Sequence, residues 1–291
     1  MHISIILPAK NESISLQNLL PRLVDAFSDR AEIIIVNDGS EDDTLEICRN
    51  FDIKVISHPY PKGNGAAIKS GARAATGELL VFMDADGQHR PEDIDMLINT
   101  LEEGYDMVVG ARNFRSHTSV QRYIANMFYN FMSSWMTGYR ILDLTSGFRV
   151  IKSNIFKRYL YLLPNGFSYP TTITMAILRN GYSLKYVPIN LDKRLGNNSH
   201  VKPVRDGIRF LLIIFRIGTL YSPLKLFFPI SLLFFLLGMI NYIYTYLSDG
   251  RFTNMSALLL VTSVLIFLIG LLSEQLTALM YSEKMTGPKD D

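Results

Sequence analysis

Apolar residues in the first half of the chain form short continuous runs that alternate with segments of helical spacing. The runs predict strands at residues 3–7, 32–36, 54–56, 79–83 and 107–109. The spacing between them predicts helices at residues 16–27, 42–49, 63–75 and 91–103, with Pro91 at the first position of the last one. Such alternation is typical of an α/β fold, with a largely parallel sheet covered by helices on both faces.

The pattern changes after Arg112. A helix is expected at residues 119–137, where aromatic and Met residues recur, and residues 143–150 lead into another strand. A late strand is expected at 182–189, near the edge of the sheet.

Two apolar stretches near the C-terminus, residues 227–247 and 255–273, contain no charged residue. Each is close to the roughly 20 residues that span the hydrocarbon of a bilayer, and the connector between them has room only for a turn. We predict two antiparallel transmembrane helices, with a soluble helical hairpin as the alternative. Asn241 is expected to hydrogen-bond between the two helices, and Glu274 is expected to lie at the membrane–water interface. Such hairpins can also pack against copies of themselves, which would make the protein a homo-oligomer.

A basic segment, residues 190–225, precedes the first span and holds seven Lys or Arg against two Asp. Within it, residues 208–221 are apolar, and Arg209 and Arg216 lie one heptad apart, which is typical of an interfacial helix on an anionic membrane. A buried helix of the soluble domain is the alternative. Basic residues before a span indicate its cytosolic side.

The predicted organisation therefore has four parts. They are a cytosolic domain at residues 1–205, an interfacial segment at 206–225, two transmembrane helices within 226–280 (about 227–247 and 255–275), and a cytosolic tail at 281–291.

Composition agrees with a membrane-anchored protein. Hydrophobic residues make up 48% of the 291 positions, and the net charge of +2 gives no bulk attraction for nucleic acid. Cys48 is the only cysteine, so no intramolecular disulfide can form, and we expect a small helix residue there rather than a catalytic thiol. The chain opens on a strand pattern instead of a secretory signal, so the first domain is expected in the cytosol and the whole multi-pass protein in the cell (inner or plasma) membrane.

Carboxylates follow the strand predicted at residues 79–83. Asp84 and Asp86 are two positions apart, so both can converge on one cation, and Gln88 adds a neutral oxygen of the kind that Mg²⁺ or Mn²⁺ accepts. A divalent ion there would neutralise charge on a leaving diphosphate. The alternative is a pair of solvated acids that cap the following helix. For His89, a structural contact and a role in the site are both open.

Two further segments, one after a strand and one at the start of a helix, offer candidate binding groups. Asp38 can accept hydrogen bonds from a base or ribose, or can simply cap a turn. Residues 62–67 open a helix with glycines, and a helix start favours anions; a plain loop-to-helix turn is the alternative.

These motifs resemble those of family-2 glycosyltransferases. Four segments occur in the family's order: residues 5–12, 35–40, 62–65 and 84–92. Residues 110–112 and 143–149 resemble the dolichyl- and polyprenyl-phosphate sugar transferase branch, which includes dolichol-phosphate mannosyltransferase and the bacterial GtrB-like enzymes. The resemblance covers about residues 2–225, and the two spans resemble those of GtrB-like members.

The resemblance implies a GT-A fold and an inverting transfer from a nucleotide-sugar to a polyprenyl phosphate, either undecaprenyl or dolichyl phosphate. It also assigns roles. The nucleotide-binding residues would be Pro8, Ala9, Glu12, Asp38, Lys62, Gly65, Asp84 and Ala85. Asp84, Asp86 and Gln88 would hold Mg²⁺ or Mn²⁺, and Asp86, Asp143 and Arg112 would act in catalysis. The acceptor phosphate and the diphosphate would be bound by Arg112, Arg122, Ser146, Arg194 and His200.

Two positions depart from the branch. His200 stands where family members often carry Lys, which changes the strength and pH dependence of the clamp over the diphosphate. Thr172 stands near a position that is usually acidic, so the sugar or acceptor is expected to differ from the mannose and glucose cases.

Alternative activities are distinguished by the base they need. A polyprenyl phosphate already carries negative oxygens and needs alignment and charge stabilisation, whereas a membrane alcohol such as diacylglycerol needs a general base, for which Asp143 is the candidate. A structural hydrogen bond to the turn at Thr145 is the other possibility for Asp143. A processive polysaccharide synthase is disfavoured because Trp135, the only tryptophan, lies outside a Q-x-x-R-W motif. A non-catalytic scaffold that binds nucleotide-sugars is the remaining alternative.

Overall fold

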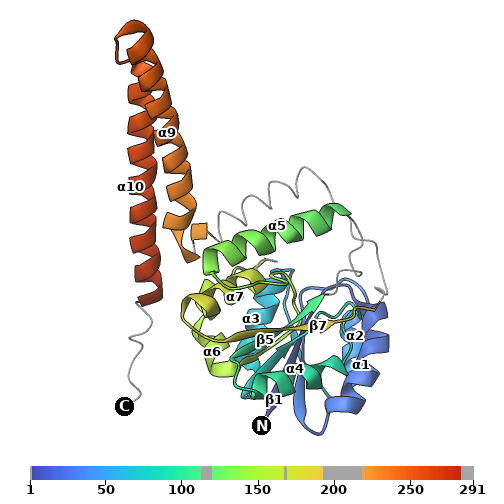
Figure 1. Cartoon of the computed structure of the whole chain (residues 1–291). Helices are drawn as coiled ribbons and strands as arrows, with labels where there is room; N and C mark the ends of the chain where they lie inside the picture. The colour runs from blue at the N-terminus through green and yellow to red at the C-terminus, as the bar shows by residue number, and fades with distance from the viewer. Residues whose placement is uncertain (1, 113–119, 167–168, 193–217, 220, 283–291) are drawn as a thin grey trace. The chain divides into compact units, whose positions relative to one another are not determined.

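The computed structural model describes residues 2–112, 120–166, 169–192, 218–219 and 221–282 (Figure 1). The chain divides into two compact units, Met1–Phe210 and Leu211–Asp291. The first is an α/β domain, and the second holds the two long apolar helices.

A seven-stranded mixed sheet forms the centre of the first unit, in the order β3-β2-β1-β4-β6-β5-β7. Its strands are β1 (Ile3–Ala9), β2 (Ala31–Asn37), β3 (Lys54–Ser57), β4 (Leu79–Phe82), β5 (Met107–Arg112), β6 (Arg149–Lys152) and β7 (Leu184–Ile189). Only β6 runs antiparallel to its neighbours, and β7 forms an edge, as predicted. The mostly parallel α/β prediction is therefore confirmed.

Strand direction determines which segments meet at one edge of the sheet. Since β1, β2 and β4 are parallel neighbours, their carboxyl ends lie side by side, with Ala9 beside Asn37 and Ile6 beside Phe82. The reversed strand β6 begins at this same edge, where Arg149 pairs with Phe82. The segment that leads into β6 therefore reaches the ends of β1, β2 and β4, where ligands bind in open α/β sheets.

Helices cover both faces of the sheet (Figure 1). The described helices of this unit are α1 (Ser13–Phe27), α2 (Thr44–Arg49), α3 (Asn64–Ala74), α4 (Asp93–Glu102), α5 (Val120–Thr137), α6 (Ser153–Arg158), the short 3₁₀ helix η2 (Leu160–Leu162) and α7 (Tyr169–Arg179). Leucines of α1 and α4 pack into one core with alternate residues of β1 and β2. On the opposite face, Gly71 of α3 lies so close to β1 that an added Cβ would stand 2.4 Å from Ile6. Small residues therefore let α3 approach the sheet.

The sequence-based boundaries need two corrections in this unit. The fourth helix begins at Asp93, and Pro91 lies in the preceding turn, where its carbonyl accepts a hydrogen bond from Ile94. The helices α6 and α7 were not predicted. Thr171, Thr172, Ile173 and Thr174 of α7 are β-branched, a composition that favours strands, yet all four are buried in a helix.

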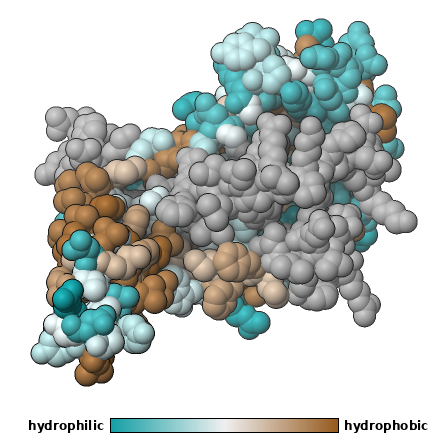
Figure 2. All heavy atoms as spheres, turned by 90° about the horizontal axis from the view of Figure 1, so that it is seen from above, coloured by the Kyte–Doolittle hydropathy of each residue, from teal (hydrophilic) through white to brown (hydrophobic). Residues whose placement is uncertain are grey.

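The second unit is a hairpin of α9 (Pro223–Asp249) and α10 (Asn254–Ser282), both long and apolar enough to cross a membrane. Gly250 ends α9 in the left-handed conformation (φ 63°) that glycine adopts readily. Figure 2 shows hydrophobic residues gathered over this hairpin. At 27 and 29 residues, the helices exceed the predicted spans at both ends.

Polar contacts join the two helices of the hairpin. Asn241 Oδ1 accepts a 2.8 Å hydrogen bond from the Ser256 hydroxyl, which confirms the interhelical contact predicted for this residue. Glu274 of α10 accepts from the Ser222 hydroxyl and the Leu224 N–H, so it caps the start of α9.

Candidate active site

A cleft of about 790 Å³ lies at the edge where the ends of β1, β2 and β4 meet. It brings together most of the predicted nucleotide-binding residues, namely Pro8, Ala9, Glu12, Asp38, Lys62, Asp84 and Ala85. Gly65 is not among the lining residues. The cleft is also lined by residues that were not predicted, namely Lys10, Pro61, Gly63, Asn64, Ala67, Thr145, Gly147, Tyr169 and Pro170.

Asp38 organises one wall of the cleft. Its Oδ1 accepts from His58 Nδ1 at 2.7 Å and from the Lys62 N–H at 2.8 Å, and its Oδ2 accepts from the Gly63 N–H at 2.8 Å. Burial opposes ionisation of this carboxyl, but these three donors outweigh burial, so its pKa lies below the usual range. Asp38 therefore holds the loop at 62–63 in place, and it still lines the cleft.

The start of α3 is bonded within the protein. The N–H groups of Gly65 and Ala66 donate to the carbonyls of Gly166 and Asn165 at 3.2 and 3.1 Å. A Cβ on Gly65 would lie 2.1 Å from the Pro164 carbonyl oxygen. The glycine at 65 thus permits close approach of a protein loop, which matches the loop-to-helix alternative for this motif.

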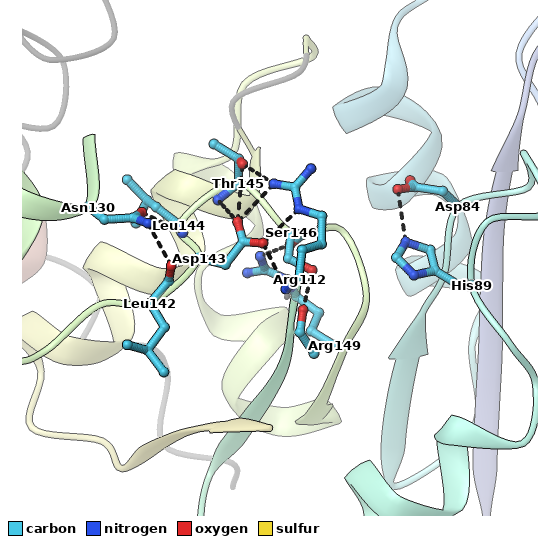
Figure 3. Close-up of polar contacts among 11 residues, drawn as sticks. Asp84, His89, Arg112, Asn130, Leu142, Asp143, Leu144, Thr145, Ser146 and Arg149 are labelled. Atoms are coloured by element: carbon cyan, nitrogen blue, oxygen red, sulfur yellow. Dashed lines mark hydrogen bonds and ion pairs between the residues drawn. The ribbon is translucent and has the colours of Figure 1, made fainter. Parts of the chain in front are cut away.

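Asp84 lines the cleft and stands two residues after the end of β4, with its side chain turned toward His89 (Figure 3). Its side chain is 37% exposed, and its Oδ2 lies 3.5 Å from Nε2 of the buried His89, whose ring stacks on Phe148. Burial opposes ionisation of Asp84, but His89 and the positive charges of Arg112 and Arg149 outweigh it and lower its pKa. The carboxylate is therefore held ionised and partly open to the cleft.

Gly147 gives the Asp84 carboxylate its space. A Cβ at position 147 would lie 2.8 Å from Asp84 Oδ2, closer than real Cβ contacts. The backbone of the segment that leads into β6 can pass beside the carboxylate only because this residue lacks a side chain.

Within the described part of the chain no three His, Cys, Asp or Glu side chains converge on one point, so Asp84 and Asp86 are the pair available to hold a divalent cation. Four carboxylates line the cleft, those of Glu12, Asp38, Asp84 and Asp86, against the two ammonium groups of Lys10 and Lys62. A diphosphate would be repelled by this excess of negative charge unless a cation offset it. Gln88, the third predicted ligand, does not line the cleft; its N–H donates to Asp86 Oδ1 at 3.1 Å.

Arg112 and Asp143 form an ion pair (Figure 3), but neither of these predicted catalytic residues lines the cleft itself. Arg112 also donates to the hydroxyl of Thr145, a cleft-lining residue, at 2.5 Å. Asp143 accepts from the Thr145 N–H at 3.2 Å, as the structural alternative for this residue predicted. Ser146 is buried, and its hydroxyl donates to the Gly110 carbonyl at 2.7 Å rather than lining the cleft.

Some predicted residues lie outside the described part of the chain. The structure does not describe Arg194, His200 or most of the basic segment, and it does not describe the side chain of Arg122. Their roles stay predictions. Tyr169 and Pro170 were missed as lining residues, although they stand just before Thr172, where the sequence departs from the branch.

Comparison with known proteins identifies the family. Residues 4–160 match the glycosyl transferase family 2, and residues 222–279 match the GtrB C-terminal hairpin. The chain belongs to family 2 of the glycosyltransferases and is therefore a glycosyltransferase that carries a GtrB-type hairpin.

Individual relatives agree. The chain is 28% identical over 314 residues to an undecaprenyl-phosphate 4-deoxy-4-formamido-L-arabinose transferase of Pseudomonas savastanoi, covering 99% of this chain and 88% of that protein. It is 37% identical to a dolichol-phosphate mannosyltransferase of Pyrococcus furiosus over 38% of this chain and 33% of that protein. Glucosyl-3-phosphoglycerate synthase of Mycobacterium tuberculosis, solved with Mn²⁺, UDP and phosphoglyceric acid, has the same fold, with a TM-score of 0.59 and 20% identity over 73% of this chain and 78% of that one. The predicted GT-A fold is confirmed.

Proposed function

We propose that this glycosyltransferase transfers a sugar from a nucleotide-sugar to a polyprenyl phosphate at the cytosolic face of the cell membrane. The observation that carries the proposal is a cleft lined by Asp84, Asp86 and the ends of β1 and β2, in a chain that also carries the hairpin. The relatives named above, which act on undecaprenyl and dolichol phosphates by their names, support this acceptor class.

The donor's diphosphate would be bound at Asp84 and Asp86 together with Mg²⁺ or Mn²⁺. When bound, such an ion neutralises charge on the leaving diphosphate. Lys10 and Lys62 line the same cleft and add positive charge, while Pro8, Ala9 and the fixed Asp38 shape the nucleotide end. Glucosyl-3-phosphoglycerate synthase, crystallised with Mg²⁺ or Mn²⁺ and UDP, supports the metal assignment through its shared fold.

The acceptor phosphate would be aligned at the cleft wall at Thr145, where Arg112 is hydrogen-bonded to the Thr145 hydroxyl. A guanidinium is well suited to a phosphate because its donors form a planar fork. Because the phosphate oxygens are already anionic, attack on the anomeric carbon requires orientation rather than a strong base. The paired, low-pKa carboxylate of Asp143 accordingly acts as an orienting group for Arg112.

The test is a transfer assay with the full chain in lipid nanodiscs. The assay supplies undecaprenyl phosphate, a panel of radiolabelled nucleotide-sugars, and either Mg²⁺, Mn²⁺ or EDTA. We expect one donor to give an organic-extractable product only when the metal is present. Asp86→Ala is expected to abolish turnover, whereas Asp95→Ala, which removes an acid paired with Arg30 at the surface, is the matched control. Absence of lipid-linked product with every donor would overturn the proposal, and product with diacylglycerol instead would replace the acceptor.

A further inference from the structure

Arg149, the first residue of β6, is a fully buried cation that the catalytic scheme above does not use. Its side chain is 0% exposed. It lies on the α7 face of the sheet, because its pairing partner Phe82 contacts Tyr169 on that face. Figure 3 shows it beside the Arg112–Asp143 pair, next to Ser146.

The hydrogen bonds of Arg149 go to two segments that are far apart in sequence. Nη2 donates to the Ser146 carbonyl, and Nη1 donates to the Pro170 carbonyl at 3.0 Å and to the Thr174 hydroxyl at 3.2 Å. Among the described residues Nε has no partner, and none of the three bonded groups is a carboxylate. A buried charge held by neutral oxygens, with one N–H unsatisfied, is poorly explained by stability alone.

Both bonded segments are walls of the cleft. Ser146 lies between Thr145 and Gly147, which line it, and Pro170 lines it together with Tyr169. Tyr169 reinforces the same junction, because its hydroxyl donates to the Gly147 carbonyl at 3.4 Å and its ring lies 5.8 Å from the Arg149 guanidinium. The guanidinium is thus a single rigid group that bonds to the wall next to Asp84 and to the start of α7.

We propose that Arg149 is a positioning residue that locks these two walls together and so sets the rate of sugar transfer rather than the affinity for the nucleotide. The proposal rests on the proposed function of the cleft. The nucleotide end is built by Pro8, Ala9 and Asp38, whereas the hydrogen bonds of Arg149 go to Ser146, Pro170 and Thr174, at the end where Gly147 lies beside Asp84. Loosening this end misaligns the reacting groups, and small displacements there lower the rate steeply.

The shape of the guanidinium explains why arginine is needed. Its donors diverge in one plane, so two of them can reach the two carbonyls at once, whereas the ammonium of lysine is a point charge on a flexible stem. Arg149→Lys keeps the charge but is expected to lose one of the two bonds. Thr174→Val keeps the size of the side chain and removes the hydroxyl that accepts from Arg149 at 3.2 Å and donates to the Pro170 carbonyl at 2.8 Å, so it weakens the same junction while the guanidinium stays in place.

The experiment measures steady-state transfer, donor binding and thermal unfolding of the full chain in nanodiscs for wild type, Arg149→Lys, Thr174→Val and Ile151→Val. Ile151 is the control because it is buried on the same face of the same strand, two positions farther from the cleft. We expect Arg149→Lys to lower kcat by about 100-fold, with donor KM and the Kd for nucleoside diphosphate within about threefold of wild type. Thr174→Val should lower kcat by a few-fold, and Ile151→Val should shift only the unfolding temperature.

Outcomes separate the inference from the proposed function. If Arg149→Lys matches wild type in kcat, or loses nucleotide affinity in parallel with kcat, the positioning role is overturned. If Arg149→Lys does not fold, unchanged kcat in Thr174→Val overturns it instead. Absence of lipid product with wild type refutes the acceptor assignment; the rate of donor hydrolysis by water, which needs no lipid, then provides the kcat comparison among the variants.

Discussion

Arg112 and Asp143 face each other in a two-point ion pair, with Nε 2.7 Å from Oδ2 and Nη2 2.9 Å from Oδ1 (Figure 3). Burial opposes ionisation of Asp143, but the hydrogen bonds and charge of Arg112 outweigh burial, so the pKa of this carboxyl lies below its usual range. The pair places an arginine against the cleft wall at Thr145 and leaves its carboxylate poorly suited to accept a proton at neutral pH.

Replacing Asp143 by Asn distinguishes the two acceptor classes. With a phosphate acceptor, we expect Asp143→Asn to lower kcat by about 10- to 100-fold, because Arg112 loses its fixed orientation. The shape of the pH–rate profile should not change, since no base is removed. The measurement is kcat from pH 5 to 9 with undecaprenyl phosphate. Asp106→Asn, which breaks a comparable pair with Lys152 outside the cleft, is the control. Transfer to diacylglycerol by wild type, with an acidic limb in its pH profile and with activity abolished in Asp143→Asn, would instead assign Asp143 as a general base for an alcohol acceptor.

Acid should destabilise the catalytic domain in a defined window. Asp38, Asp84 and Asp143 all have pKa values below the usual range in the folded chain. A carboxyl with a depressed folded-state pKa contributes stability above its unfolded value, near 3.9, and loses it as the pH falls through the folded value. As far as these three carboxyls determine it, we expect the free energy of unfolding to be independent of pH above about pH 5. We expect it to decrease as the pH falls below about pH 4. Asp143→Asn removes one titrating group, so its curve from pH 6 to pH 3 should be shallower; identical slopes would contradict the assignment.

Much of the fold could be predicted from the sequence because its signals are local. Continuous apolar runs predicted the strands, and parallel order then placed Asp38 and Asp84 at one edge. The helix α7 could not be predicted this way, because Thr171–Thr174 favour strands and only packing against the sheet makes them helical. The roles of Gly147 and Arg149 were equally hidden. Both depend on the antiparallel entry of β6 beside β4, which is a long-range pairing that no local pattern encodes.

Adding one methyl group at Gly147 tests the geometry around Asp84. The Cβ of Gly147→Ala would stand 2.8 Å from Asp84 Oδ2, so the Asp84 carboxylate would have to turn away from its present position. We expect kcat to fall by about 100-fold, together with weaker Mn²⁺ binding by calorimetry in the presence of nucleoside diphosphate. Gly166→Ala, where an added Cβ meets nothing within 4 Å, should behave as wild type. Normal metal binding and turnover in Gly147→Ala would show that the Asp84 carboxylate does not need this space.

The exposed face of α5 leads to a prediction about the membrane. Phe128, Phe131 and Trp135 lie at helical spacing on α5 and are 49%, 64% and 46% exposed. No acidic residue occurs in the sequence from position 107 to 142, while four arginines do. Apolar aromatic side chains in a cationic context are typical of helices that lie on anionic lipid. We therefore expect α5 to rest on the bilayer surface in the full protein.

Trp135 is the only tryptophan of the chain and reports this contact directly. In proteoliposomes of anionic phospholipid, we expect its emission to be blue-shifted and to be quenched by lipids brominated near the headgroup end of the acyl chain. In the control, Trp135→Phe combined with Ile14→Trp moves the reporter to an exposed position of α1, where quenching should be weak. Phe128→Ser with Phe131→Ser should reduce Trp135 quenching and slow transfer to a long-chain acceptor more than to a short, water-soluble one. Unquenched Trp135 in every lipid mixture would show that this face of α5 does not contact the membrane.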